Sequence, residues 1–280
     1  MEKKNFDGAD IKVSELGIGT WQLTGSEQEN IAALKYALDN GVNFIDTAEI
    51  YGTESIVGKA IKAKNRKELF IATKLWTSNF RYDDAIKACY ASLERLGTSY
   101  VDLYQLHWPN KDVPIAETMK AMEKLADEGK IRSIGVSNFS VEELKEAQEA
   151  MSKYKIASNQ VEYSIVTRDI ESEGLIDYCK KEGIEIIAYS PLAHGKIFED
   201  KELVGLLEGI GKKYNKTPAQ VAINWLIKKE VFPIPKASNI MHVKENIAAT
   251  EFSLSNEDMK SIEEAYAKHR KDPLAKTIKR

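Results

Sequence analysis

Short apolar runs alternate along the chain with longer amphipathic segments. A run such as Ile184–Tyr189, rich in β-branched residues and bounded by turns and charges, is typical of a strand buried in a parallel sheet. Between such runs, apolar residues recur at helical spacing, as at Ala85, Cys89 and Leu93. The pattern predicts eight strands, at residues 16–20, 42–46, 69–74, 101–106, 131–136, 156–161, 184–189 and 231–235.

Start and stop signals predict a helix after each strand. Ser140 precedes Glu142 and Glu143 as an N-cap, Pro114 lies in a first helical turn, and Gly97 follows a helix by about one residue. No linker or change of composition divides the repeating units. The chain is therefore expected to form one domain, residues 1–280, with the α/β fold of a single (β/α)8 TIM barrel.

Additions to the regular barrel are expected at three places. Lys4 to Val13, with a turn at Asp7-Gly8, predicts an N-terminal β-hairpin that closes the bottom of the barrel. About forty residues with two helical patterns separate the seventh and eighth strands, and a further helix is expected from about Asn256 to Lys268. The basic residues 269–280 lack a pattern and predict a flexible, solvated tail.

Composition narrows the possible partners. The 280 residues include 40 Lys plus Arg and 43 Asp plus Glu, a net charge of -3 that disfavours nucleic acids and acidic membranes. No run approaches the roughly 18 apolar residues of a membrane span, and no apolar run follows the N-terminal charges, so a cytoplasmic location is expected. Cys89 and Cys179 are too isolated for a metal or disulfide framework and are expected in the core. A small-molecule substrate and a monomer or weak homo-oligomer are expected.

Polar residues stand where the expected strands end, which is the active face of such barrels. Asp46, Lys74 and His107 end the second, third and fourth strands, and Tyr51 follows Asp46 by five residues. Each alone is compatible with a structural role. Together they provide a proton donor, a cation, an anion and a hydrogen-bonding group, which suits reduction of a carbonyl. An ammonium near the phenol is expected to lower the tyrosine pKa from its ordinary value of about 10.

The sequence around these residues resembles the aldo-keto reductases from about Leu16 to Asn246. The similar motifs are Asn43 to Gly52, Ala72 to Trp76, Gln105 to Pro109, Gly135 to Phe139, Asn159 to Tyr163, Ala188 to Leu192 and Ile234 to Lys236. The resemblance implies a catalytic tetrad of Asp46, Tyr51, Lys74 and His107, with Tyr51 as the acid in NAD(P)H-dependent reduction of aldehydes or ketones to alcohols.

The resemblance also implies a nicotinamide cofactor. Ser137, Asn138 and Gln160 would hold its carboxamide, for which hydroxyl and amide groups are suited, and the ring would stack on Tyr189. No GxGxxG sequence follows a strand, so the pyrophosphate would be bound differently from the Rossmann mode. The remaining residues expected at the cofactor are Thr20, Trp21, Asp46, Ser190, Leu192, Lys236, Ser238, Asn239, His242, Glu245 and Asn246.

Cofactor choice depends on the segment after the eighth strand. Members of the family usually have a serine and an arginine where this chain has Ala237 and His242, whereas Glu245 and Asn246 match the adenine-contacting positions. Lys236 still provides an ammonium for a 2′-phosphate, so NADP(H) is expected to be preferred and NAD(H) is possible. No metal is expected.

Aromatic residues predict an apolar substrate pocket. Trp21, Trp76 and Trp108 follow strands on the active face and are expected to wall it together with Tyr51 and His107. Trp225 lies in a helical pattern and is expected in the core. The loop from Tyr163 to Arg168 departs from the His-Pro-Tyr run of many members, so the substrate is not specified.

Two other functions remain compatible with the sequence. Lys74 could be the Schiff-base nucleophile of a barrel aldolase, although Asp46 would disfavour this by keeping the lysine charged. The chain could also be a cofactor-binding regulatory or interaction subunit with little turnover, as some relatives of the aldo-keto reductases are. The intact tetrad argues against this second alternative.

Overall fold

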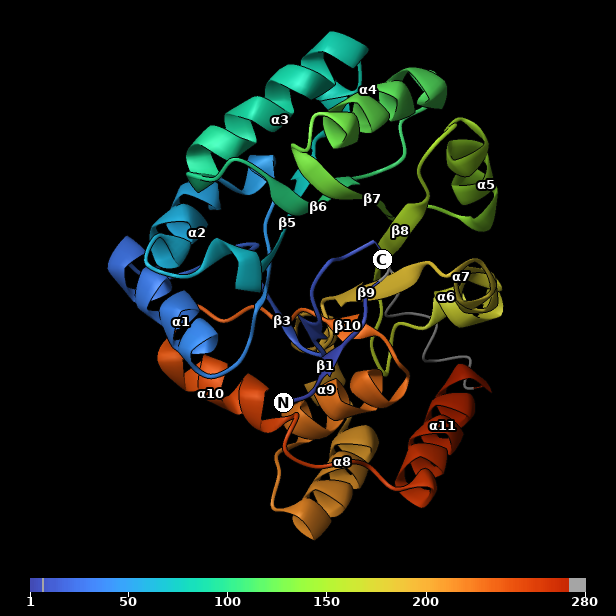
Figure 1. Cartoon of the computed structure of the whole chain (residues 1–280). Helices are drawn as coiled ribbons and strands as arrows, with labels where there is room; N and C mark the ends of the chain where they lie inside the picture. The colour runs from blue at the N-terminus through green and yellow to red at the C-terminus, as the bar shows by residue number, and fades with distance from the viewer. Residues whose placement is uncertain (7, 272–280) are drawn as a thin grey trace.

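Eight parallel strands form a barrel that is almost closed (Figure 1). The computed structural model describes residues 1–6 and 8–271. Neighbouring strands in sequence are neighbours in the sheet, and a parallel bridge between Gly19 and Lys236 joins the first strand to the last. The strands are β3 (Gly17–Gly19), β4 (Phe44–Asp46), β5 (Phe70–Leu75), β6 (Val101–Leu106), β7 (Ile131–Ser137), β8 (Ile156–Glu162), β9 (Glu185–Tyr189) and β10 (Phe232–Pro233).

All eight strands were expected, and this confirms the fold class. The expected range of β6 is reproduced to the residue, whereas β10 covers only two of the five residues expected for it. Pro233 and Pro235 lack the N–H group that a sheet ladder needs, so regular pairing ends early there.

Helices surround the barrel on its outside (Figure 1). The Ser140 cap is confirmed: its hydroxyl accepts from Glu143 N–H, and the Glu143 carboxylate accepts from Ser140 N–H in return. The α-helices are α1 (Glu27–Asp39), α2 (Glu54–Ile61), α3 (Tyr82–Leu96), α4 (Ile115–Asp127), α5 (Val141–Glu149), α6 (Asp169–Ser172), α7 (Leu175–Glu182), α8 (Lys201–Tyr214), α9 (Pro218–Lys228), α10 (Ile240–Ala248) and α11 (Asn256–Lys271). The 3-10 helices are η1 (Glu49–Tyr51), η2 (Arg66–Glu68), η3 (Thr77–Asn79) and η4 (Ala193–Phe198).

The three expected additions lie where the sequence placed them. The two helices between the last two strands are α8 and α9, and α11 begins at Asn256 as expected but extends to Lys271. Residues 272–280 of the expected tail lie outside the described residues. None of the helices in the described chain is long and apolar enough to cross a membrane.

The N-terminal hairpin closes the bottom of the barrel. Strands β1 (Lys3–Lys4) and β2 (Val13–Ser14) pair in antiparallel fashion, and Asp7 of the expected turn lies outside the described residues. Phe6 packs between Phe70 and Phe232, with ring centroids 4.7 and 5.3 Å away. The Gly8 carbonyl accepts a hydrogen bond of 2.8 Å from the Ser133 hydroxyl.

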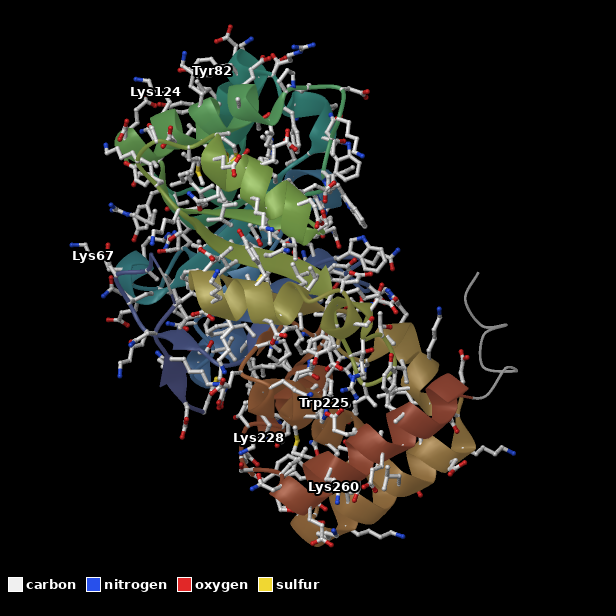
Figure 2. All side chains as sticks on the ribbon, turned by 90° about the vertical axis from the view of Figure 1, so that its right-hand side faces the viewer. Lys67, Tyr82, Lys124, Trp225, Lys228 and Lys260 are labelled. Atoms are coloured by element: carbon white, nitrogen blue, oxygen red, sulfur yellow. The ribbon has the colours of Figure 1, made fainter. Side chains whose placement is uncertain are left out.

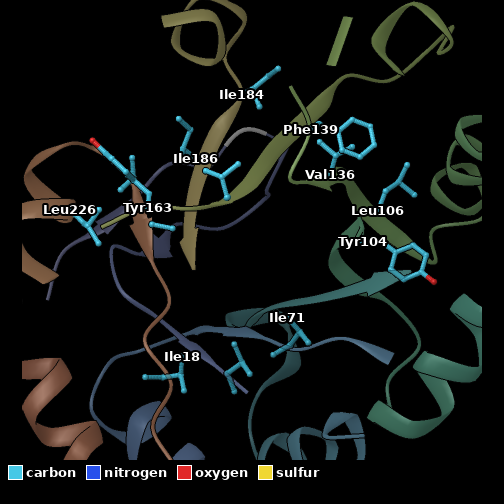
Figure 3. Packing of buried hydrophobic residues seen from close by; sticks show 14 of the residues in the cluster. Ile18, Ile71, Tyr104, Leu106, Val136, Phe139, Tyr163, Ile184, Ile186 and Leu226 are labelled. Carbon is cyan, nitrogen blue, oxygen red and sulfur yellow. The ribbon is translucent and has the colours of Figure 1, made fainter. Parts of the chain in front are cut away.

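Alternation along the strands separates two apolar regions. Ile71 faces outward into the layer between the sheet and the helices, part of which Figure 3 shows, whereas Phe70 and Ala72 face the barrel interior. Lys74 follows Phe70 and Ala72 at the next inward-facing position of β5. The barrel interior therefore changes from apolar at the bottom to polar at the top. Cys89, Cys179 and Trp225 are buried in the outer layer, as expected. Lys67 and Lys124, in contrast, extend outward from the surface (Figure 2).

Candidate active site

A cleft of about 1010 Å³ lies at the carboxyl ends of the strands. Its volume is at the upper end of the usual range for small-molecule sites, roughly 300–1,000 Å³. The structure brings together along this cleft most of the residues singled out from the sequence: Trp21, Asp46, Tyr51, Trp76, His107, Trp108, Ser137, Asn138, Gln160, Tyr189, Ser190, Leu192, Lys236, His242, Glu245 and Asn246.

Four of the expected residues do not line the cleft. Lys74 is fully buried beneath it. Thr20 is also fully buried, and its hydroxyl is 3.1 Å from the Asp46 carbonyl oxygen, to which it donates. The hydroxyl of Ser238 accepts from Thr24 N–H at 2.9 Å, and Asn239 caps α10 by accepting from the backbone N–H of His242, also at 2.9 Å.

Lys74 and Asp46 form a buried ion pair. The Lys74 ammonium lies 2.5 Å from Asp46 Oδ1 and donates to the Thr47 carbonyl oxygen at 2.9 Å. Burial by itself lowers the pKa of Lys74, but the interactions with the Asp46 carboxylate and with Tyr51 outweigh this effect, so the pKa is raised above its ordinary value. The lysine is therefore a charged ammonium near neutral pH.

Tyr51 and His107 face each other above this pair. The Tyr51 hydroxyl and His107 Nε2 are 3.2 Å apart, and the Lys74 ammonium lies 5.1 Å from the centre of the Tyr51 ring. Burial raises the pKa of Tyr51 and Asp46 adds to this effect, whereas Lys74 lowers it. The pKa is raised overall. The sequence-based expectation of a lowered value therefore fails for the protein alone, because it omitted the cost of burying a phenolate.

His107 is neutral in the folded protein. Burial and the nearby Lys74 ammonium lower the pKa of His107 to about 3. Its buried Nδ1 has no hydrogen-bond partner among the described residues. The Trp76 ring packs edge-on against the imidazole, with a centroid distance of 5.1 Å and an interplanar angle of 87°. A neutral imidazole beside Tyr51 can hold an oxygen atom by hydrogen bonding.

Two buried amides hold the second oxygen of Asp46. Gln160 Nε2 donates to Asp46 Oδ2 at 2.8 Å and Gln105 Nε2 donates to the same oxygen at 3.3 Å. The amide nitrogen of Gln160 also lies 3.3 Å from Gln105 Oε1. Sequence reasoning missed Gln105, although it lies two residues before His107 and a strand places such residues on one face.

The polar residues at the ends of β7, β8 and β9 meet on one side of the cleft. The Ser137 hydroxyl donates to the Gln160 carbonyl oxygen at 2.8 Å, and Asn138 Nδ2 donates to Ser137 Oγ at 3.0 Å. The Tyr189 hydroxyl donates to Asn138 Oδ1 at 2.9 Å. Asn138 has a φ of +63°, a left-handed conformation that asparagine tolerates better than most residues.

At the far end of the cleft, α10 contributes polar groups beside β10. Lys236 Nζ donates to the Gln22 carbonyl oxygen at 3.2 Å, and His242 Nδ1 lies 3.1 Å from Glu245 Oε2. Asn246 Nδ2 is buried and has no hydrogen-bond partner among the described residues. An unpartnered amide in a cleft wall fits a ligand that presents a hydrogen-bond acceptor there.

Comparison with known proteins identifies the relationship. The model of the aldo/keto reductase family matches residues 15–267. The chain belongs to this family. It is 38% identical over 255 residues to the glyoxal reductase of Bacillus subtilis, covering 90% of this chain and 89% of that protein. It is 36% identical over 276 residues to a methylglyoxal reductase of Escherichia coli, covering 95% and 96%. A solved aldo-keto reductase from Klebsiella pneumoniae in complex with NADPH superimposes with a TM-score of 0.87 at 34% identity, covering 95% and 96%.

This aldo/keto reductase has further cleft residues that sequence reasoning missed, among them Gln22, Ile50, Glu162 and His194. His194 Nε2 lies 3.0 Å from the Ser190 hydroxyl, and its ring packs edge-on against Trp21 at 5.6 Å. Its backbone adopts a φ of +56° within η4, a left-handed conformation that no sequence pattern indicated. The contact joins the loop after β9 to the loop after β3.

Proposed function

We propose that this aldo/keto reductase reduces the carbonyl of small aldehydes and ketones, with 2-oxoaldehydes as the best substrates and NADPH as the preferred reductant. The observation that carries the proposal is the buried ion pair of Lys74 and Asp46 beneath Tyr51, whose hydroxyl faces the neutral His107 at 3.2 Å. Burying two charges is costly. A buried ion pair beside an open cleft is therefore more typical of a catalytic site than of a purely structural contact.

The residues present fit a nicotinamide dinucleotide. Asn138, Gln160 and Tyr189 would hold the nicotinamide end, and Lys236 with Asn246 would hold the adenosine end. The unpartnered amide of Asn246 suits an adenine acceptor, and Lys236 supplies the positive charge that a 2′-phosphate requires. NADPH in the similar Klebsiella protein supports this choice, and NADH remains a possible weaker reductant. When bound, the cofactor supplies a hydride to the carbonyl carbon.

The catalytic work of this chain is to bind the carbonyl oxygen and protonate it. Tyr51 and neutral His107 would hold the oxygen between the phenol and Nε2, where negative charge develops. The phenol then donates its proton to that oxygen, which becomes the hydroxyl of the alcohol. Lys74 stabilises the phenolate left behind, and Asp46 keeps Lys74 charged.

The mouth of the cleft supports the proposed substrate class. Trp76 lies against His107, and Trp21 and Trp108 expose 43% and 45% of their surface at the opening. Apolar walls around one polar oxygen site suit a small carbonyl compound. The activities named for the Bacillus and Escherichia relatives, on glyoxal and methylglyoxal, support 2-oxoaldehydes. We also propose that the chain acts as a single barrel domain, in the cytoplasm, as a monomer or weak homo-oligomer.

The test is oxidation of NADPH by the purified protein in the presence of methylglyoxal, followed by near-ultraviolet absorbance. Tyr51→Phe should lower kcat/KM by about 10²–10⁴-fold, the range for a removed general acid. Its Kd for NADPH should stay within about twofold, because the hydroxyl lies at the carbonyl end of the site.

Three other results would count against the proposal. Near-normal turnover by a folded Tyr51→Phe variant would remove Tyr51 from the mechanism. NADPH binding without turnover on a panel of aldehydes would favour the regulatory subunit. Borohydride trapping of a substrate on Lys74 would favour the aldolase, which the ion pair with Asp46 opposes.

A further inference from the structure

Glu49 is a carboxylate beside the active site with no part in the chemistry described above. It begins η1, two residues before Tyr51, and its side chain reaches across to the loop after β5. Glu49 Oε1 accepts a hydrogen bond from the backbone N–H of Trp76. The side-chain amide of Asn79 donates to both carboxylate oxygens, at 3.1 and 3.2 Å. Glu49 therefore connects two loops that are 27 residues apart in the chain.

The loop that Glu49 holds carries a wall of the substrate cleft. Trp76 is the N-cap residue of η3, and its own side chain provides no capping hydrogen bond. The carboxylate of Glu49 accepts from the Trp76 N–H and so satisfies this donor from outside the turn. Trp76 lines the cleft and packs edge-on against His107 at 5.1 Å. The adjoining Thr77 carbonyl accepts from Asn110 Nδ2 at 3.0 Å, which extends the connection to the loop after β6.

We propose that Glu49 is a positioning residue for carbonyl reduction: it fixes Trp76 against His107 and so sets the substrate end of the cleft. This inference rests on the proposed function. The hydrogen bonds to Glu49 involve a carboxylate and are therefore stronger than neutral ones. Since η1 contains both Glu49 and Tyr51, the contact holds the acid and the aromatic wall in one arrangement.

A purely structural carboxylate would affect stability alone, so the experiment separates substrate binding from folding. Glu49→Ala should raise KM for methylglyoxal by about 10- to 100-fold, with the Kd for NADPH within about twofold. Glu49→Gln keeps an oxygen that can accept from Trp76 N–H and should restore most of the loss. Should Glu49→Ala fail to fold, Glu49→Asp, whose carboxylate is withdrawn by one methylene, takes its place with the same expectation.

Glu123 offers a matched control. Its carboxylate also holds a loop by backbone hydrogen bonds, from Ser152 N–H at 2.9 Å and Lys153 N–H at 2.7 Å. That loop precedes β8 and so lies at the amino ends of the strands, away from the cleft. Glu123→Ala should lower stability with KM unchanged. The inference is overturned if folded Glu49→Ala keeps KM within twofold of wild type, or if Glu123→Ala changes KM as much.

A readout without turnover distinguishes failure of this inference from failure of the proposed function. Acrylamide quenching of Trp76 is obtained as the difference between each protein and the same protein with Trp76→Phe. Glu49→Ala should increase this quenching and Glu123→Ala should not. If wild type oxidises no NADPH, the proposed function fails while this contact is still tested. If quenching of Trp76 is the same in Glu49→Ala as in wild type, Glu49 does not hold Trp76 and the inference fails.

Discussion

Lys74 carries a positive charge where its side chain is shielded from water, since only 1% of the side chain is exposed. Removing an ammonium and a carboxylate from water costs several kcal/mol each, and their attraction offsets this only with good geometry and further hydrogen bonds. Here Thr47 O accepts from Lys74, while Gln105 and Gln160 donate to Asp46. At the scale of the residue, the charges of this ion pair shift the pKa of Tyr51.

Removing that charge should change the pH dependence of the enzyme. Lys74 lowers the pKa of Tyr51 against the effect of burial, so Lys74→Met should raise that pKa further. In the proposed mechanism the phenol must be protonated, so the rate of reduction should fall as pH rises through the tyrosine pKa. The alkaline limb should therefore move to higher pH, and kcat should fall by about 10²–10⁴-fold because the acid is weaker. Profiles of kcat against pH measure this, and an unmoved alkaline limb would mean that Lys74 does not tune Tyr51.

His107 should make the fold sensitive to acid. The imidazole of an unfolded chain binds a proton near pH 6.5, whereas burial and Lys74 lower the pKa of His107 to about 3 in the folded protein. Between these values the unfolded state binds more protons, so the free energy of unfolding falls as pH falls through this window. His107→Asn should lose less stability than wild type between about pH 7 and about pH 5 in urea unfolding. An equal loss of unfolding free energy in both proteins would contradict the lowered pKa of His107 in the folded state.

At the scale of elements, one arginine joins three of them. The Arg168 guanidinium, in the loop before α6, stacks between Trp225 of α9 and Tyr266 of α11, 4.9 and 4.3 Å from the ring centres. It also donates to the carboxylates of Glu171 and Glu263. Figure 2 shows Trp225 near α11. Docking of α11 therefore depends on a buried cation rather than on apolar contact alone.

Arg168→Met should lower the free energy of unfolding by about 1–3 kcal/mol, because the charged hydrogen bonds to two partly exposed carboxylates are lost. Among the described residues, Lys229 then remains the ion-pair partner of both Glu171 and Glu263, at 3.4 and 2.9 Å. Urea unfolding measures the change. Lys260→Met is the control, because its pair with Glu264 is exposed and spans 3.6 Å, and exposed pairs contribute about 0–1 kcal/mol. Equal stability of the Arg168 variant and wild type would show that α11 docks without this cluster.

At the scale of the whole molecule, the two ends of the barrel have different roles. The carboxyl ends of the strands border the open cleft, whereas the amino ends are closed by the N-terminal hairpin and its Phe6 side chain, which is 2% exposed. Chemistry and closure are thus separated along the barrel axis. A substitution at the closed end should change stability and leave catalysis intact.

Phe6→Ala tests this separation. It removes an aromatic ring packed against Phe70 and Phe232 and should lower the free energy of unfolding by about 3–5 kcal/mol. At a temperature where the variant is folded, kcat and KM for methylglyoxal should stay within about twofold of wild type, because the cleft lies at the other end. A variant of unchanged stability, or one whose KM rises severalfold, would refute the division of roles.

The fold and the meeting of Asp46, Tyr51, Lys74 and His107 at one end of the barrel could be predicted from the sequence because they depend on local order. The short apolar run around Ile71 and the helical spacing after it are properties of neighbouring residues, and polar residues at successive strand ends must meet at one face of a barrel. The lack of a backbone N–H at Pro233 and Pro235 is also a local property, and it explains why the last strand is short.

Only the tertiary structure decided the energetics of the site. Whether the pKa of Tyr51 rises or falls depends on how deeply the fold buries the phenol, not on Lys74 alone. The partners of Gln105 and Glu49 lie 59 and 27 residues away in the chain, on other strands and loops. A sequence pattern specifies which face a residue occupies, but burial and hydrogen-bond geometry arise only when strands and loops distant in the chain pack together.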